Sequence, residues 1–205
     1  NVYGIQLAAG ADNVTIGGTT YGQGNTIGWS DSYGINYAAT TGTQVIKGNF
    51  IGATYDATWK DLTPGDHGIY VNGAGGLTIG GTHTGSWALP AKTRINEGNF
   101  IAAHDVAGQA GIYVNDGAPT ILGNYIGTDR LGQFFGNDYG IYMAAGADAV
   151  TIGSITYGQG NVIGANLTAD IYYASTSGST TFIAGNYLGT TYDAGTWFDA
   201  GLGTG

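Results

Sequence analysis

The chain has no cysteine, and it has only five lysine and arginine residues and three prolines among its 205 residues. The absence of cysteine excludes a disulfide framework and any cysteine-ligated metal centre. The five basic residues stand against 14 acidic ones, which gives a formal net charge of −9 at pH 7. We expect no nucleic-acid partner, because too few cations are present to build a basic surface for phosphates.

Long apolar runs are missing as well. No stretch approaches the roughly 18 consecutive apolar residues of a membrane-spanning helix, so we expect no membrane span. Charged residues make up only 9% of the chain, whereas glycine accounts for 40 of its 205 residues. Such a glycine content is typical of disordered segments, but here glycine recurs at fixed places beside isoleucine, valine and tyrosine. The pattern therefore predicts a folded repeat protein.

A five-residue motif occurs six times: Gly, Asn, any residue, Ile or Leu, and then Gly or Ala. A second pattern precedes each copy, and its apolar positions are Ile5, Ile35, Ile69, Ile112, Ile141 and Ile171. A third apolar position lies between the two, at Ile16, Ile46, Ile79, Ile121, Ile152 and Ile183. Each unit thus contains three short strand candidates in constant order, and a unit that recurs every few tens of residues is typical of a solenoid.

The units alternate between a longer and a shorter form. Units one, three and five carry an insertion before the motif, whereas Ile46 and Ile51 of unit two are only five residues apart. The hexapeptide Thr-Tyr-Gly-Gln-Gly-Asn occurs at residues 20–25 and again at 156–161. We therefore predict one domain over residues 1–205, built from three double-coil repeats at roughly 1–66, 67–136 and 137–205. Short strands, glycine-rich turns and no helical periodicity predict an all-β parallel β-helix of about six coils with three strands each.

Three phrases carry a resemblance to a known family: Gly-Asn-Tyr-Ile-Gly-Thr-Asp at 123–129, Val-Thr-Ile-Gly-Gly at 14–18 and Gly-Asn-Asp-Tyr-Gly-Ile at 136–141. They resemble the right-handed parallel β-helix repeats of secreted and cell-surface proteins of bacteria and archaea. The resemblance covers nearly the whole chain and implies a right-handed fold, as is general for parallel crossovers, and an extracellular or cell-surface location. It leaves function open, because that family includes polysaccharide lyases, adhesins, phage tailspikes and surface-layer modules.

The asparagine of each motif stands two residues before the motif's Ile or Leu, so both side chains point to the same face of the strand. That face is the core, where six amides would form one column: Asn25, Asn49, Asn99, Asn124, Asn161 and Asn186. A buried amide without a partner costs about 1–3 kcal/mol. We therefore expect each amide to bond to its neighbours in adjacent coils, and we interpret the column as structural.

The first strand of each unit has one outward row, formed by Gln6, Asn36, Tyr70, Tyr113, Tyr142 and Tyr172. Its four tyrosines on consecutive coils would stack about 4.8 Å apart. Such a surface suits a sugar or a neighbouring molecule; alternatively, the rings only stabilise the sheet through cross-strand contacts. An ice-binding array is not expected, because the threonines do not keep one outward row.

Acidic residues fall mostly in loops, where oxygen-rich side chains suit Ca²⁺. The candidate ligands are Asp129, Asn137 and Asp138, with solvated loop acids as the alternative reading, and we expect no other cofactor. Lysines and arginines are scattered, and the three histidines show no ligand spacing. We therefore expect no enzyme, although a pair of carboxylates brought together across coils leaves a polysaccharide lyase-like activity as the less favoured alternative.

The function predicted from these observations is a structural extracellular module that stacks head to tail into a fibre, sheath or surface layer. Solenoids normally need terminal caps for solubility, and no helix or polar cap is evident at either end. The ends are also in phase, since residues 1–5 match residues 137–141. The same phase is expected of a piece of one longer solenoid. The alternative function is a carbohydrate-binding or adhesin module, with polysaccharide as its partner.

Overall fold

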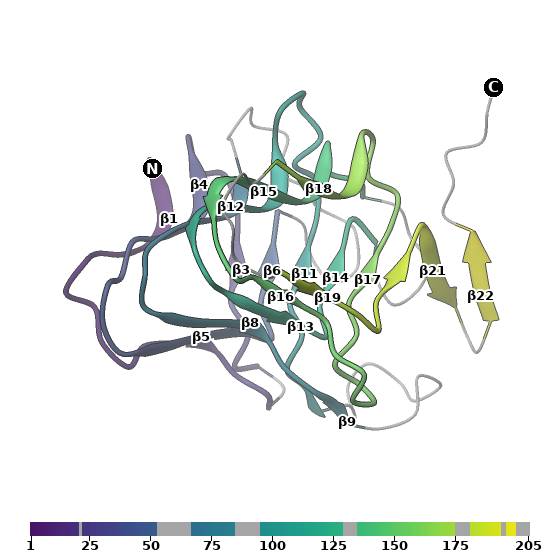
Figure 1. Cartoon of the computed structure of the whole chain (residues 1–205), viewed down its shortest axis with the longest axis horizontal. Coiled ribbons are helices and arrows are strands. Elements are labelled where there is room, and N and C mark those ends of the chain that lie inside the picture. The colour runs from purple at the N-terminus through teal and green to yellow at the C-terminus, as the bar shows by residue number, and fades with distance from the viewer. Residues whose placement is uncertain are drawn as a thin grey trace.

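The computed structural model describes residues 1–20, 22–52, 67–84, 95–128, 135–174, 181–193 and 196–199. Every regular element in these residues is a β-strand, and three parallel sheets of six strands enclose one core (Figure 1). The chain is therefore a right-handed parallel β-helix of six coils with three strands per coil, which confirms the predicted fold class. In the described part of the chain, no helix has the length and apolarity needed to cross a bilayer.

Each sheet takes one strand from every coil. Sheet A consists of β1 (Tyr3–Leu7), β4 (Tyr33–Tyr37), β7 (His67–Asn72), β12 (Ala110–Gly117), β15 (Tyr139–Ala147) and β18 (Ala169–Tyr173). Sheet B consists of β2 (Thr15–Gly17), β5 (Thr43–Lys47), β8 (Gly76–Gly80), β13 (Thr120–Leu122), β16 (Thr151–Ile152) and β19 (Phe182–Ile183). Sheet C consists of β3 (Thr26–Ile27), β6 (Phe50–Ile51), β11 (Phe100–Ile101), β14 (Tyr125–Ile126), β17 (Val162–Ile163) and β20 (Tyr187–Leu188).

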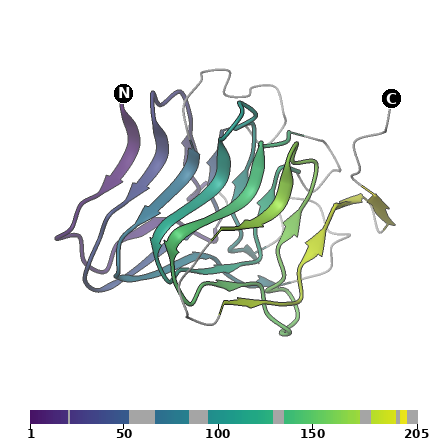
Figure 2. The ribbon, with the colours of Figure 1, turned by 45° about the horizontal axis from the view of Figure 1, so that its top comes forward.

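Figure 2 shows the strands of sheet A side by side in chain order, from the N-terminal coil to the C-terminal coil. Two antiparallel pairs lie outside the three sheets. One joins β9 (His83–Thr84) to β10 (Ile95–Asn96) within the coil-three insertion, and the other joins β21 (Thr190–Asp193) to β22 (Thr196–Asp199) after coil six.

The register of the sheets places equivalent residues of successive coils directly above one another. In sheet A the core column is Ile5, Ile35, Ile69, Ile112, Ile141 and Ile171. Sheet B aligns Ile16, Ile46, Ile79, Ile121, Ile152 and Ile183, and sheet C aligns Ile27, Ile51, Ile101, Ile126, Ile163 and Leu188. In coils two to five these side chains are fully buried, and each contributes about 1.5–3 kcal/mol of hydrophobic stabilisation.

The corner between sheets B and C alternates between two glycine positions. Coils two, four and six place a glycine with positive φ directly before the motif asparagine: Gly48 (φ 68°), Gly123 (φ 62°) and Gly185 (φ 69°). Coils one, three and five place it directly after the core isoleucine: Gly17 (φ 86°), Gly80 (φ 88°) and Gly153 (φ 75°). A Cβ at Gly80 would lie 2.6 Å from Oδ1 of Asn124 and 1.9 Å from the carbonyl oxygen of Leu122. The longer coil thus leaves room for the amide of the shorter coil above it, which explains the two-unit period physically.

A second apolar cluster lies on the outer face of sheet C. Phe100, Tyr125 and Val162 occupy outward positions of neighbouring strands, yet all three are buried. Phe50 and Phe135 pack against them. Alternation along the strands assigns these side chains to solvent, so this cluster was not predicted from the sequence.

Candidate functional site

The six motif asparagines form one continuous hydrogen-bonded stack, here called the asparagine column. The Nδ2 of each residue donates to the Oδ1 of the next at 2.8 to 3.0 Å. The backbone N–H of the same residue donates to the same oxygen at 2.9 to 3.1 Å. Asn49 is 1% exposed and Asn99, Asn124 and Asn161 are fully buried, whereas Asn25 is exposed at the N-terminal end. The predicted stack of side-chain amides is therefore confirmed.

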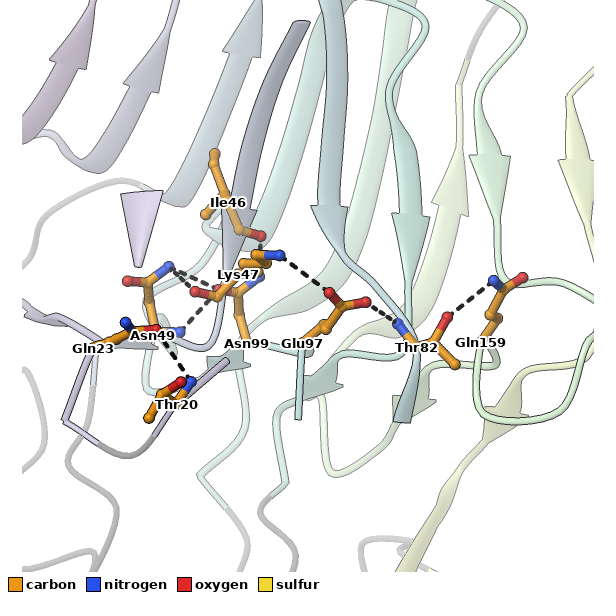
Figure 3. A network of polar contacts seen from close by, with 9 residues as sticks. All are labelled: Thr20, Gln23, Ile46, Lys47, Asn49, Thr82, Glu97, Asn99 and Gln159. Atoms are coloured by element: carbon orange, nitrogen blue, oxygen red, sulfur yellow. Dashed lines mark hydrogen bonds and ion pairs between the residues drawn. The ribbon is translucent and has the colours of Figure 1, made fainter. Parts of the chain in front are cut away.

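The column also fastens sheet B. Nδ2 of Asn99 donates to the carbonyl oxygen of Ile46 at 2.8 Å, and Nδ2 of Asn124 donates to that of Ile79 at 2.9 Å (Figure 3 shows the first of these). Each interior amide thus joins its own coil, the coil before it and the coil after it. Because the interior amides are buried and bonded on every side, their role is structural, as interpreted from the sequence.

The asparagine column has a direction. From Asn25 to Asn161, each Nδ2 and each backbone N–H donates to the Oδ1 of the following coil, and each Oδ1 from Asn49 to Asn186 accepts these two bonds from the preceding coil. Among the described residues, nothing donates to Oδ1 of Asn25, and nothing accepts the backbone N–H of Asn186. Coil one therefore ends the column with an acceptor, and coil six ends it with a donor.

The outward tyrosines of sheet A form a second stack, here called the tyrosine ladder: Tyr70, Tyr113, Tyr142 and Tyr172. The register pairs them across β7, β12, β15 and β18. Successive ring centroids lie 5.6, 4.8 and 4.8 Å apart, with interplanar angles of 14°, 5° and 25°. The first three are half-buried and Tyr172 is exposed, so the ladder lies on the surface, as expected.

A second outward row flanks the ladder, and the sequence reasoning missed it. The ring of Tyr33 stacks on Tyr70 at 4.3 Å, and that of His67 stacks on Tyr113 at 4.3 Å. Both rows share one face because the glycine between them points inward: a Cβ at Gly34 would lie 3.0 Å from a methyl group of the core residue Ile51. The signal in the sequence was an aromatic residue directly before the Gly-Ile pair.

The stacking geometry limits what the tyrosine ladder can bind. Because neighbouring rings lie nearly parallel, each ring face between Tyr70 and Tyr172 is covered by the next ring. Ring edges and hydroxyls remain toward solvent, whereas a sugar that stacks on an aromatic side chain needs an open ring face. The arrangement is well suited to stabilising the sheet through cross-strand contacts. Contact with a sugar or a neighbouring molecule stays a prediction.

His67 is held neutral within this face. Its Nδ1 accepts the backbone N–H of Ala110 at 3.0 Å. Burial, and secondly the nearby His104, lower the pKa of His67 from 6.5 to about 3. Because Nδ1 is an acceptor, the neutral ring carries its proton on Nε2. At neutral pH the imidazole is thus a stacked, uncharged structural side chain.

Two of the three predicted calcium ligands lie at the corner between sheets C and A. Oδ1 of Asn137 accepts the backbone N–H of His104 at 3.2 Å, and its Nδ2 donates to Asn166 at 2.9 Å. The carboxylate of Asp138 accepts the backbone N–H of Gly108 at 2.5 Å and the hydroxyl of Thr168.

Hydrogen-bond donors of the protein thus occupy the oxygens offered to calcium. The third predicted ligand, Asp129, lies outside the described residues. Within the described ranges, no three or more His, Asp and Glu side chains form a group that could hold a metal ion. Calcium binding at this corner stays a prediction.

A polar network ties the corner insertions together on the outside of the stack (Figure 3). Lys47 Nζ lies 3.1 Å from Oε1 of Glu97, and the other carboxylate oxygen of Glu97 accepts the backbone N–H of Thr82 at 2.9 Å. The Thr82 hydroxyl accepts Nε2 of Gln159 at 3.1 Å. Lys47 is thus engaged structurally, whereas Lys60, Lys92, Arg94 and Arg130 lie outside the described residues.

The outer face of sheet B shows that the expectation of no common outward row of threonines was wrong. The position directly before each core isoleucine forms one outward row: Thr15, Val45, Thr78, Thr120, Thr151 and Phe182. Four threonines therefore do share a row, contrary to the expectation, because Thr-Ile recurs in four units and alternation turns each threonine outward. The row is a single column, broken by valine at coil two and ended by phenylalanine.

The core columns end at coil six with side chains that are partly exposed to solvent. Tyr173, Ile183 and Leu188 are 45%, 45% and 46% exposed, whereas their counterparts in coil five, Met143, Ile152 and Ile163, are fully buried. The strands β18, β19 and β20 are also the edges of their sheets. This apolar end, here called the open coil, is the feature of the described residues that most resembles a docking surface.

Comparison with models of protein families, with curated proteins and with solved structures found no match for this chain. The resemblance to secreted β-helix repeat proteins therefore remains a prediction based on the motifs.

Proposed function

We propose that the chain is a structural β-solenoid module that stacks head to tail into an extracellular fibre, sheath or surface layer. The observation that carries the proposal is the open coil, where Tyr173, Ile183 and Leu188 lie in core columns yet are nearly half exposed. Strands at the edge of a sheet and exposed apolar side chains favour the addition of further strands. A second copy would bury them by continuing the same columns.

The rest of the molecule supports a structural role. Side chains that resemble a site by type, such as His67 and Asp138, are used in hydrogen bonds within the chain. The low content of lysine and arginine offers few cleavage points to trypsin-like proteases, which suits an extracellular location.

Sedimentation and electron microscopy of the purified 205-residue chain test this function. We expect mass to grow with protein concentration and elongated particles to appear. A chain that stays monomeric at the highest attainable concentration would contradict the proposal.

The second candidate is a carbohydrate-binding or adhesin module, favoured by the exposed ring of Tyr172 at the end of the ladder. A glycan array distinguishes the two functions: binding that is lost in Tyr172→Ala, without any change in mass, would favour the second candidate. Activity on acidic polysaccharides, the mark of a lyase-like enzyme, is the least favoured outcome.

A further inference from the structure

We propose that the joint between copies is polar: coil six of one copy receives coil one of the next, and the backbone N–H of Asn186 donates to Oδ1 of Asn25. This inference rests on the proposed function and deepens it, because it names the two surfaces that meet and excludes the symmetric alternatives. The occupant of the open coil is a second copy of this chain.

The first support is the direction of the asparagine column. Between Asn25 and Asn186, every backbone N–H of the column donates to the oxygen of the following coil. The acceptor left at coil one and the donor left at coil six complete each other. Two copies meeting through coil one would bring two carbonyl oxygens together, and two meeting through coil six would bring two N–H groups together.

The second support is the distribution of apolar surface. Ile183 and Leu188 of coil six are 45% and 46% exposed, whereas Ile16 and Ile27 of coil one are only 5% and 6% exposed. Only contacts that include coil six therefore bury much apolar area. A joint between two copies of coil one would leave the open coil in water.

The third support is the alternation of corners. Coil six has the short corner and coil one the long one, so a joint from six to one repeats the internal steps from coil two to three and from coil four to five. In those steps, Asn49 donates to Asn99 and Asn124 to Asn161, both at 3.0 Å. A joint of coil six to another coil six would place two short corners together, a step that does not occur among the six coils.

Cysteine cross-linking tests the polarity, because the chain has no cysteine of its own. Thr15 and Phe182 belong to the same outward row of sheet B and are both exposed. A polar joint would place Phe182 of one copy beside Thr15 of the next, one strand spacing away, about 4.8 Å. Thr15→Cys and Phe182→Cys chains are prepared separately, mixed and treated with a short bis-maleimide linker.

We expect cross-linked dimers that contain one chain of each kind, with few or none from either variant alone. Dimers of two Thr15→Cys chains or of two Phe182→Cys chains would overturn the polarity. So would an assembly, seen by light scattering, in which no pairing cross-links. If neither variant nor the unaltered chain assembles at all, the proposed function itself fails, which separates the two ideas.

A charge on the open coil gives an independent readout. Ile183→Lys and Leu188→Lys are expected to raise the concentration at which the chain assembles by about tenfold or more, since about 1.4 kcal/mol of lost association energy corresponds to a factor of ten. Ile155→Lys is the matched control, because Ile155 is 89% exposed in the corner insertion of coil five and belongs to none of the core columns. Equal effects of all three changes would overturn the assignment of the open coil as the joint.

Discussion

Replacing Asn124 with alanine tests how much the asparagine column stabilises the solenoid. Its Oδ1 accepts two hydrogen bonds from Asn99, from the backbone N–H at 2.9 Å and from Nδ2 at 3.0 Å. Its own Nδ2 donates to Asn161 and to the carbonyl oxygens of Ile79 and Leu122. Alanine removes all of these bonds from a fully buried place.

The magnitude follows from what remains unpaired. The backbone N–H of Asn99 and one hydrogen of its side-chain amide both lose their common acceptor, Oδ1 of residue 124. The carbonyl oxygen of Ile79 loses a donor. Oδ1 of Asn161 keeps the backbone N–H of residue 124, at 2.9 Å in the unaltered chain. At about 1–3 kcal/mol for each unsatisfied buried group, Asn124→Ala is expected to destabilise the fold by about 3–5 kcal/mol. This exceeds the 1–3 kcal/mol expected for a single unpaired amide.

Asn25→Ala is the matched control in the same column. Asn25 is exposed, and after the change Oδ1 of Asn49 still accepts the backbone N–H of residue 25, at 3.1 Å in the unaltered chain. We expect a loss below about 1 kcal/mol. Urea unfolding followed by circular dichroism measures both, and for a chain of this size 3–5 kcal/mol lowers the midpoint by about 1–2 M. Equal midpoint shifts for the two variants would refute the reasoning.

Two further predictions concern the corners and the tyrosine face. Gly80→Ala is expected to lower the free energy of unfolding in urea by at least about 3 kcal/mol, because Gly80 has φ +88° and a Cβ would lie 1.9 Å from a backbone oxygen. Gly10→Ala is the control, because a Cβ there would meet no atom within 4 Å. Similar losses of stability in the two variants would contradict the corner geometry. Burial lowers the pKa of His67 to about 3, so below pH 6.5 the unfolded chain binds a proton that the folded chain does not. The His67 contribution to stability is therefore constant above pH 6.5 and falls by about 1.4 kcal/mol per pH unit below it, or by about 3 kcal/mol at pH 4. Unfolding measured between pH 7 and pH 4 should show a shallower loss in His67→Gln than in the unaltered chain, and equal slopes would show that His67 is not the cause.

The core of this fold could be predicted from the sequence because the repeat makes each inference six times over. One isoleucine with a polar neighbour two residues away, as at Asn124 and Ile126, fixes which side chains point inward. Repetition at equivalent places then aligns them into columns. Predicting the asparagine column required only the two-residue offset between each asparagine and its core isoleucine or leucine.

The outer faces could not be predicted in the same way. Alternation along a strand tells whether a side chain points outward, but not whether another segment covers it. Phe100 and Tyr125 point outward from sheet C and are nevertheless buried in one cluster, with Phe135, a residue outside the strands, packed against them. The inward-pointing glycine of sheet A also breaks the strict alternation, and this brings Tyr33 onto the same face as Tyr70.

A change at the end of the asparagine column should affect assembly of the copies but not the stability of the single chain, and the variant Asn25→Ala tests this. Within its own chain, Asn25 donates through Nδ2 to Asn49 at 2.9 Å, and none of the described residues donates to its Oδ1. Asn25→Ala should therefore leave the unfolding midpoint nearly unchanged yet weaken the polar joint, since the acceptor for the N–H of Asn186 is gone. Light scattering of Asn25→Ala, compared with the unaltered chain at equal concentrations, is expected to show a smaller mass. If Asn25→Ala assembles as readily as the unaltered chain, the column does not continue from copy to copy, and apolar contact at the open coil alone would have to account for the joint.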